Sequence, residues 1–212
     1  MAATWQAGTG PRQGRPTAAE RNPVHHPSRP LAVALAVAAV STLLTSCSAS
    51  PPPAAPAAQT FEVPDSAVAA TVTTPDGWDR AGQAAPLVVR STTPSGDPGF
   101  TANVVVTTSD PGTATLEDKA AEAAEALQTS ADVAMDPTQP GPVTVAGLPA
   151  YRLGATRTVD GVPVAQVETV VEVATPAGSA FVYVTETYAT GDAEGAAQAR
   201  AVTDSLVVTP AG

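Results

Sequence analysis

Cysteine and lysine each occur once in this 212-residue sequence, and histidine occurs twice. A single cysteine excludes a disulfide-stapled domain, and so few cysteines and histidines exclude a zinc site built from clustered ligands. The formal net charge of −10 excludes the basic face that a nucleic-acid-binding protein needs. The sequence also has at most one apolar run, and that run is short, so a multi-pass membrane protein is excluded.

The first 46 residues have the pattern of a secretory signal. Residues 1–30 carry four arginines against one acid, and an apolar run of 14 residues extends from Leu31 to Leu44. Such a run is too short for a membrane-spanning helix, which takes about 20 residues. A basic stretch, a short apolar run and small residues after it are typical of a signal peptide. The leader is long for this class, which makes Val24 a candidate for the true start of translation.

The end of the run, Leu44-Thr45-Ser46-Cys47, resembles the lipobox of bacterial lipoproteins, in which an aliphatic residue and two small residues precede a cysteine. The resemblance implies cleavage after residue 46 and a diacylglyceryl group on the sulfur of Cys47. A thiolate is the strong nucleophile that such a modification needs. The lipid would hold the protein at the extracytoplasmic face of the cell membrane. The alternative is a soluble secreted protein that is cut elsewhere.

The chain that follows the signal is strongly acidic. From Cys47 onward it has six basic and 19 acidic residues, a net charge of −13, and no histidine. Such a charge keeps a domain soluble and discourages binding to anionic surfaces, so the membrane contact is expected through the lipid alone. Residues 47–59 are rich in proline and alanine and have no large apolar side chain, which predicts an extended tether.

Residues 60–209 are predicted to form a single α+β domain, followed by a short tail at residues 210–212. Alternation of apolar and polar residues predicts strands at residues 68–74, 86–92, 100–106, 151–156, 165–173 and 180–188. Asp160-Gly161 and Pro176-Ala177-Gly178 have the composition of hairpin turns, so the last three strands are expected to form an antiparallel meander.

Two helices are predicted to flank this sheet. The first follows a capping box of Thr115 and Asp118, and its apolar face consists of Leu116, Ala120, Ala123 and Leu127. The second begins after Asp192, with an inner face of Ala199, Val202 and Leu206. The expected fold is therefore an antiparallel sheet of about six strands flanked by two main helices.

Several short features occur in a fixed order along the domain: Phe61-x-Val63-Pro64, Pro75-Asp76-Gly77-Trp78, the strand at residues 100–106, an acidic alanine-rich helix and Gly147-Leu148-Pro149-Ala150-Tyr151-Arg152. Together with the lipobox, this order resembles the LpqN-type lipoproteins of actinobacteria, whose domain is similar to PsbP-like folds. The resemblance covers about residues 60–209. It implies an exported, lipid-anchored protein of the cell envelope with a mostly non-enzymatic role, and it brings no catalytic residues with it.

The residue types give little support to catalysis. Without histidine after Cys47, a serine–histidine pair is excluded, and the only lysine, Lys119, lies in a predicted helix rather than in a phosphate loop. Paired carboxylates such as Glu168 and Glu172 remain as an acid–base option, but they fall on the predicted solvent face of a strand. The sequence therefore predicts no catalytic, cofactor-binding or metal-binding residue, and no enzyme.

Aromatic residues make up only 4% of the sequence, so their positions are informative. Five of them are expected to share the core between the sheet and the helices: Trp78, Phe100, Tyr151, Phe181 and Tyr183. As a second interpretation, some line a slot for an acyl chain or a partner, and the candidates are Trp78, Tyr151, Phe181 and Tyr183. The favoured function is a lipid-anchored binding or scaffold domain that acts on envelope proteins. The alternative is a carrier of a lipid or another apolar ligand, which would need a cavity of about 300 Å³ or more between sheet and helices.

Overall fold

Three long strands form the centre of the larger of two sheets: β8 (Leu148–Val159), β9 (Val162–Thr175) and β10 (Gly178–Ala189). They are consecutive in the chain and pair antiparallel, β8 with β9 and β9 with β10. Asp160 and Gly161, with φ of 50° and 83°, form the two-residue turn between β8 and β9, which requires positive φ at both positions. The predicted meander and its Asp-Gly hairpin are therefore confirmed.

The computed structural model describes residues 54–82, 84–96, 99–130, 132–139 and 141–209. The predicted signal peptide, Cys47 and the tail at residues 210–212 lie outside the described residues, so what the sequence predicts for them stays a prediction. Within the described ranges, none of the helices has the length and hydropathy that a membrane span requires.

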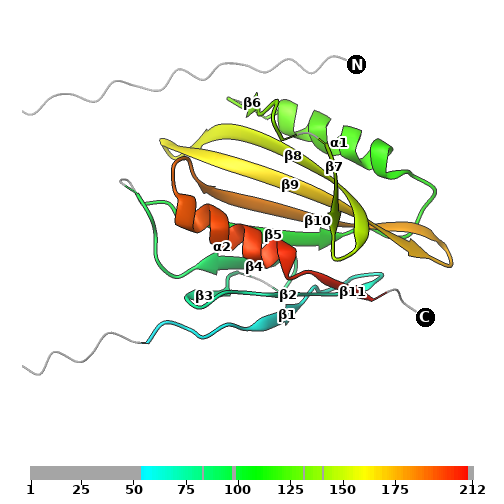
Figure 1. The fold of residues 1–212 in the computed structure, drawn as a ribbon, viewed down its shortest axis with the longest axis horizontal. Helices are drawn as coiled ribbons and strands as arrows, with labels where there is room; N and C mark the ends of the chain where they lie inside the picture. The colour runs from blue at the N-terminus through cyan, green and yellow to red at the C-terminus, as the bar shows by residue number, and fades with distance from the viewer. Residues whose placement is uncertain (1–53, 83, 97–98, 131, 140, 210–212) are drawn as a thin grey trace, which may run out of the picture. The chain divides into compact units, whose positions relative to one another are not determined.

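Shorter strands extend the larger sheet on both sides. On one side β10 pairs with β5 (Asn103–Thr108), β5 with β4 (Leu87–Ser91) and β4 with β3 (Trp78–Arg80). On the other side β8 pairs with β6 (Ala134–Met135) and with β7 (Gly141–Val145). The resulting order is β3-β4-β5-β10-β9-β8-β6, with β7 alongside β8 (Figure 1).

A smaller sheet joins the beginning and the end of the domain. It consists of β1 (Thr60–Glu62), β2 (Ala69–Thr73) and β11 (Val207–Thr209), in the order β1-β2-β11. All its pairings are antiparallel. Contacts of the domain with the chain before β1 begin at Pro56, whose carbonyl oxygen accepts a hydrogen bond of 2.8 Å from the N–H of Gly77.

Both predicted helices are confirmed. Helix α1 (Leu116–Gln128) has Thr115 as its N-cap, and its buried residues are the four apolar residues expected from their spacing. Helix α2 (Ala193–Asp204) begins after Asp192, whose side chain accepts a hydrogen bond of 2.9 Å from the N–H of Gly195. These side chains satisfy backbone donors that the first turn of a helix leaves free.

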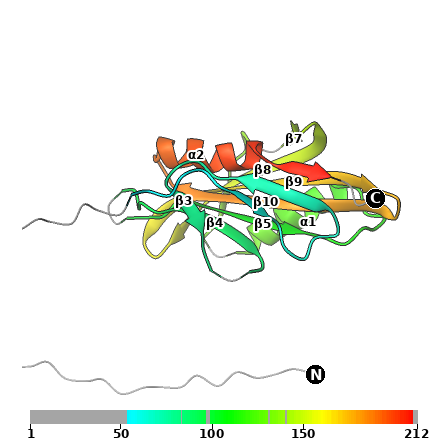
Figure 2. The same cartoon turned by 90° about the horizontal axis from the view of Figure 1, so that it is seen from below.

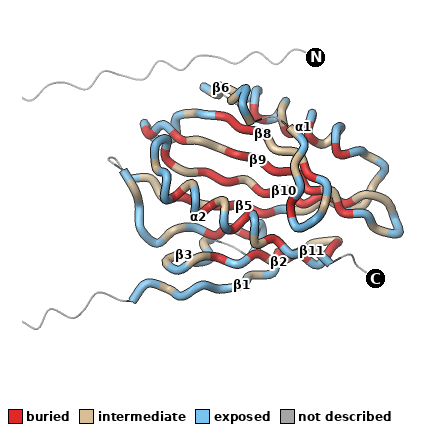
Figure 3. Tube along the Cα trace, in the orientation of Figure 1, coloured by how far each residue is buried: buried red, intermediate tan, exposed pale blue. Residues whose placement is uncertain are grey.

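The larger sheet carries a different layer on each face. Helix α1 contacts β8 and β9 on one face, here called the α1 face, whereas α2 contacts β10 and β5 on the opposite one, the α2 face (Figures 1 and 2). The small sheet packs on the α2 face as well. Because side chains alternate along a strand, Val171 and Val182 belong to the α2-face core, while Val170 and Phe181 belong to the α1-face core. Figure 3 shows buried residues along β9 and β10, interrupted by half-buried ones.

The α+β class, the antiparallel sheet and the two flanking helices are confirmed, but the strands are more numerous than predicted. The described residues form eleven strands in two sheets instead of about six in one. Several of the additional strands, such as β1, β3 and β6, have only two or three residues. A segment of that length is too short to show the alternation from which a strand is predicted.

Candidate functional site

Three of the four aromatic residues proposed as contacts lie together beneath α1. Phe181 is 1% exposed, and Tyr151 and Tyr183 are half-buried against the same cluster. The register explains this arrangement, because Val170 of β9 pairs with Tyr151 on one side and with Tyr183 on the other. The cluster is completed by Leu116, Ala123, Leu127 and Leu153.

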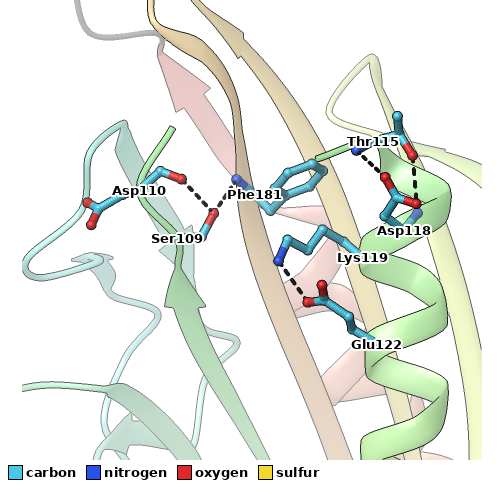
Figure 4. Close-up of polar contacts among 7 residues, drawn as sticks. All are labelled: Ser109, Asp110, Thr115, Asp118, Lys119, Glu122 and Phe181. Carbon is cyan, nitrogen blue, oxygen red and sulfur yellow. Dashed lines mark hydrogen bonds and ion pairs between the residues drawn. The ribbon is translucent and has the colours of Figure 1, made fainter. Parts of the chain in front are cut away.

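The first turns of α1 are fixed above this cluster. Figure 4 shows the Phe181 ring projecting from β10 toward α1, with Lys119 beside it. The N–H of Asp118 donates to Thr115 Oγ1 at 3.2 Å, and the N–H of Thr115 donates to Asp118 Oδ2 at 3.0 Å. These two bonds form the predicted capping box, and they lower the pKa of the Asp118 carboxyl. Lys119 Nζ forms an ion pair of 2.7 Å with Glu122 Oε2.

Trp78 does not join the other aromatic residues. It is fully buried in the α2-face core, and its indole Nε1 donates a hydrogen bond of 2.8 Å to Oε1 of Gln198 in α2. The expectation of one shared aromatic core is therefore confirmed for Tyr151, Phe181 and Tyr183 and wrong for Trp78 and for Phe100, which packs against a third cluster. Trp78 belongs to β3, at the far edge of the sheet from α1, and its position in the alternation directs it to the α2 face.

A cavity of about 420 Å³ lies at the start of α2. Its walls carry hydroxyl and carboxylate groups, among them Ser91, Thr93, Ser95, Asp76, Asp192 and Glu194. Two of these carboxylates already have protein partners: Asp76 Oδ1 accepts from the N–H of Ala58 at 2.7 Å, and Asp192 caps α2 and also accepts from the hydroxyl of Ser95. The cavity is thus acidic, and its carboxylates help to hold the fold.

A second cavity, of about 600 Å³, lies beside the β1–β2 hairpin. Apolar side chains of Val63, Val68 and Ala70 line it together with Glu62, Asp65 and Arg80. Neither cavity is lined by Tyr151, Phe181 or Tyr183. The proposed aromatic contact residues and these cavities are therefore in different parts of the domain.

The α2 face also contains a buried charge that the sequence analysis did not identify. Glu186 of β10 is completely buried, and its Oε1 accepts a hydrogen bond of 2.6 Å from the hydroxyl of Thr203 in α2. Arg200, one helical turn earlier, places its Nε 3.3 Å from the same oxygen. Burial raises the pKa of Glu186, while Thr203 and Arg200 act in the opposite direction. The carboxyl group thus ties α2 to the sheet.

A second arginine lies close to this group. Arg152 of β8 donates from Nε to Oγ1 of the buried Thr169, at 3.3 Å. Desolvation lowers the pKa of Arg152, and the like charge of Arg200 adds to the effect. Gly154 lies two residues further along β8, and a side chain there would collide with Gln139, whose Cγ is 2.5 Å from the position of a Cβ atom. The loop before β7 therefore borders this part of the α2 face.

The sequence did contain a signal for Glu186. In β10, Ala180, Val182, Val184 and Glu186 occupy alternate positions and share one face, so an acid follows three apolar residues into the core. A carboxylate in such a row has to find a partner across the core. Its partners come from α2, and only the tertiary structure identifies them.

The two strand carboxylates considered for acid–base chemistry have different surroundings. Glu168 is half-buried, and its desolvation raises the pKa of the carboxyl group. Oε1 of Glu172 accepts a hydrogen bond of 2.6 Å from the hydroxyl of Ser179. The prediction that Glu168 faces solvent freely is wrong, because α1 packs on that face of β9. In the part of the chain that the structure describes, no group of three or more His, Cys, Asp or Glu side chains could hold a metal ion.

Comparison with solved structures finds proteins of similar fold. The chain is similar to LpqN of Mycobacterium tuberculosis, described as involved in cell envelope biogenesis, with 14% identity, a TM-score of 0.56, and coverage of 72% of this chain and 92% of LpqN. It also matches CyanoP, the PsbP protein of Synechocystis sp. PCC 6803, with 14% identity, a TM-score of 0.48, and coverage of 78% and 99%. No family model and no curated protein matches the sequence.

The likeness to LpqN shows a shared α+β fold, and at this identity it shows the fold alone. The TM-score of 0.48 with CyanoP is too low to support an argument from that structure. The chain is therefore an α+β protein with the fold of LpqN, and its role has to be argued from its own residues.

Proposed function

We propose that this protein is exported, is held at the outer side of the cell membrane by a lipid on Cys47, and acts as a non-enzymatic binding or scaffold domain of the cell envelope. The observation that carries the proposal is the sequence Leu44-Thr45-Ser46-Cys47 directly after a 14-residue apolar run. The shared fold with LpqN, a protein involved in envelope biogenesis, supports the same location.

The arrangement of polar groups supports a binding role over a catalytic one. The chain after Cys47 has no histidine, so a hydroxyl nucleophile would need another base. The buried carboxyl of Glu186 is engaged with Thr203 and Arg200, which ties two elements of the fold together. Glu172 is paired with Ser179, and Glu168 lies beside α1. These groups serve the packing of the domain.

Metabolic labelling with an alkyne analogue of palmitate tests the anchoring. We expect the wild-type protein to incorporate the label through the acyl chains attached to Cys47. At least two chains are expected there, because one acyl chain binds a membrane only weakly. The Cys47→Ala variant should lose the label completely, and the neighbouring Ser48→Ala variant should keep it. Label that persists in Cys47→Ala would remove the anchoring part of the proposal.

The 600 Å³ cavity beside the β1–β2 hairpin favours a second candidate function, that of a carrier for an apolar ligand. Its volume lies in the range of small-molecule sites, about 300–1,000 Å³, and six of its eleven lining residues are apolar. Native mass spectrometry of the protein purified from the envelope separates the two functions. A bound lipid of defined mass supports the carrier, and a co-purifying protein supports the scaffold.

A further inference from the structure

Two arginines converge on the α2 face of a strongly acidic chain. Only six basic residues follow Cys47, and two of them, Arg152 of β8 and Arg200 of α2, contact residues on adjacent strands of this face, Thr169 of β9 and Glu186 of β10. Like charges also repel each other, so a close pair of arginines costs free energy unless an anion lies between them.

Each guanidinium group is held from the sheet side. Arg152 donates from Nε to Thr169, and Arg200 Nε lies 3.3 Å from Glu186 Oε1. Thr169 pairs with Val184, two residues before Glu186, so the two anchors are diagonal neighbours on adjacent strands. Such neighbours are about 7–8 Å apart. A guanidinium has five N–H donors. Arg152 uses its Nε–H for Thr169, and the buried Nε–H of Arg200 makes no hydrogen bond among the described residues, so at least four donors on each arginine remain for another acceptor.

Glu186 balances these two cations only in part. It is completely buried, and its Oε2 has no hydrogen-bond partner in the described part of the chain. Burial raises its pKa, while Thr203, Arg200 and Arg152 act in the opposite direction. Two further acids lie near the cluster: Asp204, at the exposed end of α2, acts on Arg152, and Asp136, which accepts from Thr138, acts on the neighbouring Tyr188. The side chain of Arg200 is 31% exposed, so a ligand from solvent can reach the pair.

We propose that Arg152 and Arg200, held by Thr169 and Glu186, form a binding site for a phosphate group. Tetrahedral phosphate oxygens can accept N–H donors from two guanidinium groups at once, and arginine forks match this geometry better than lysine does. The site lies over β8, β9 and β10 between α2 and the loop that carries Gln139. The phosphate site rests on the binding function proposed above, and it names the class of ligand that would be bound.

Two probes distinguish the sources of such a phosphate: inorganic phosphate and glycerophosphoglycerol, the headgroup of phosphatidylglycerol without its acyl chains. Each is titrated into the purified full-length protein in a neutral detergent, with sodium chloride at equal ionic strength as the reference, and NMR chemical shifts are followed. Binding of inorganic phosphate alone identifies a free phosphate ligand, and binding of both identifies a phosphate group that a lipid headgroup can supply.

Variants test whether these residues form the site. A hydrogen bond to a charged group contributes about 1.5–3 kcal/mol, so Arg152→Gln and Arg200→Gln should each weaken binding about tenfold or more. Arg90→Gln is the matched control, because Arg90 is an exposed arginine of β4 and follows Val89 of the α2-face core, so its side chain points away from α2. Glu186→Gln should tighten binding, because it removes the competing negative charge and keeps an acceptor for Thr203.

The arginine variants are expected to weaken phosphate binding and Glu186→Gln to tighten it, and these opposite effects separate a binding role from a folding role. A purely structural role of the cluster would move all three cluster variants in the same direction. The proposal is overturned if both probes shift the spectrum no more than chloride does, or if Arg90→Gln weakens binding as much as Arg200→Gln. Lipid labelling of Cys47 is read independently, so the anchoring and the phosphate site can fail separately.

Discussion

Replacing Phe181 by alanine tests the packing of α1 most severely. Phe181 is 1% exposed and lies between β10 and the start of α1. A phenylalanine side chain buries about 150–250 Å², which at about 25 cal/mol per Å² corresponds to about 4–6 kcal/mol as an upper bound. Phe-to-Ala changes in protein cores cost about 3–5 kcal/mol, and we expect a loss of that size. In a domain of this length, the melting temperature should fall by roughly 6–20 °C.

Urea denaturation of the purified protein measures this loss as a change in midpoint at constant slope. Tyr151→Ala is the matched comparison, because Tyr151 packs against the same cluster but is only half-buried, and it should lose about half as much. If Phe181→Ala loses less than about 1 kcal/mol, or no more than Tyr151→Ala, then the ring does not support the α1 layer and lines an open slot.

Two further predictions concern pH and helix capping. The pKa of Glu186 and that of Glu168 are raised by burial above the ordinary value of 4.5, so the folded state binds more protons than the unfolded state just above that pH, and stability falls as the pH rises toward the raised values. The double variant Glu186→Gln/Glu168→Gln should flatten this decline in thermal unfolding, and an unchanged decline would contradict the assignment. Thr115→Ala should cost about 1 kcal/mol by removing the N-cap of α1, whereas Thr115→Ser should be nearly neutral; equal losses in urea denaturation would show that the hydroxyl does not cap the helix.

Local pattern was sufficient to predict the long elements. The spacing from Leu116 to Leu127 identified α1 together with its buried face, and Asp160-Gly161 identified a hairpin. These features depend on neighbouring residues, whose side chains and dihedral angles are set by the local sequence. The predicted face of Val171 and Val173 in β9 is likewise buried, because strand alternation leaves little freedom in which side an apolar row faces.

The remaining features depend on contacts between distant residues. The small sheet pairs Thr71 with Val207, and no local signal joins two strands of five and three residues so far apart in the chain. The partners of Glu186 lie on α2, so its role was not evident from β10 alone. Trp78 was assigned to the wrong core because the sequence does not say at which edge of the sheet β3 lies.

The N-terminus of the protein purified from the cell membrane tests the central claim most directly. The first basic residue after Cys47 is Arg80, so trypsin should release a peptide from Cys47 to Arg80. Mass spectrometry should find this peptide only in lipid-modified form, with the mass of a diacylglyceryl group on the cysteine. A tryptic peptide that runs unbroken through the Ser46–Cys47 bond, or an unmodified peptide that begins at Cys47, would contradict the account.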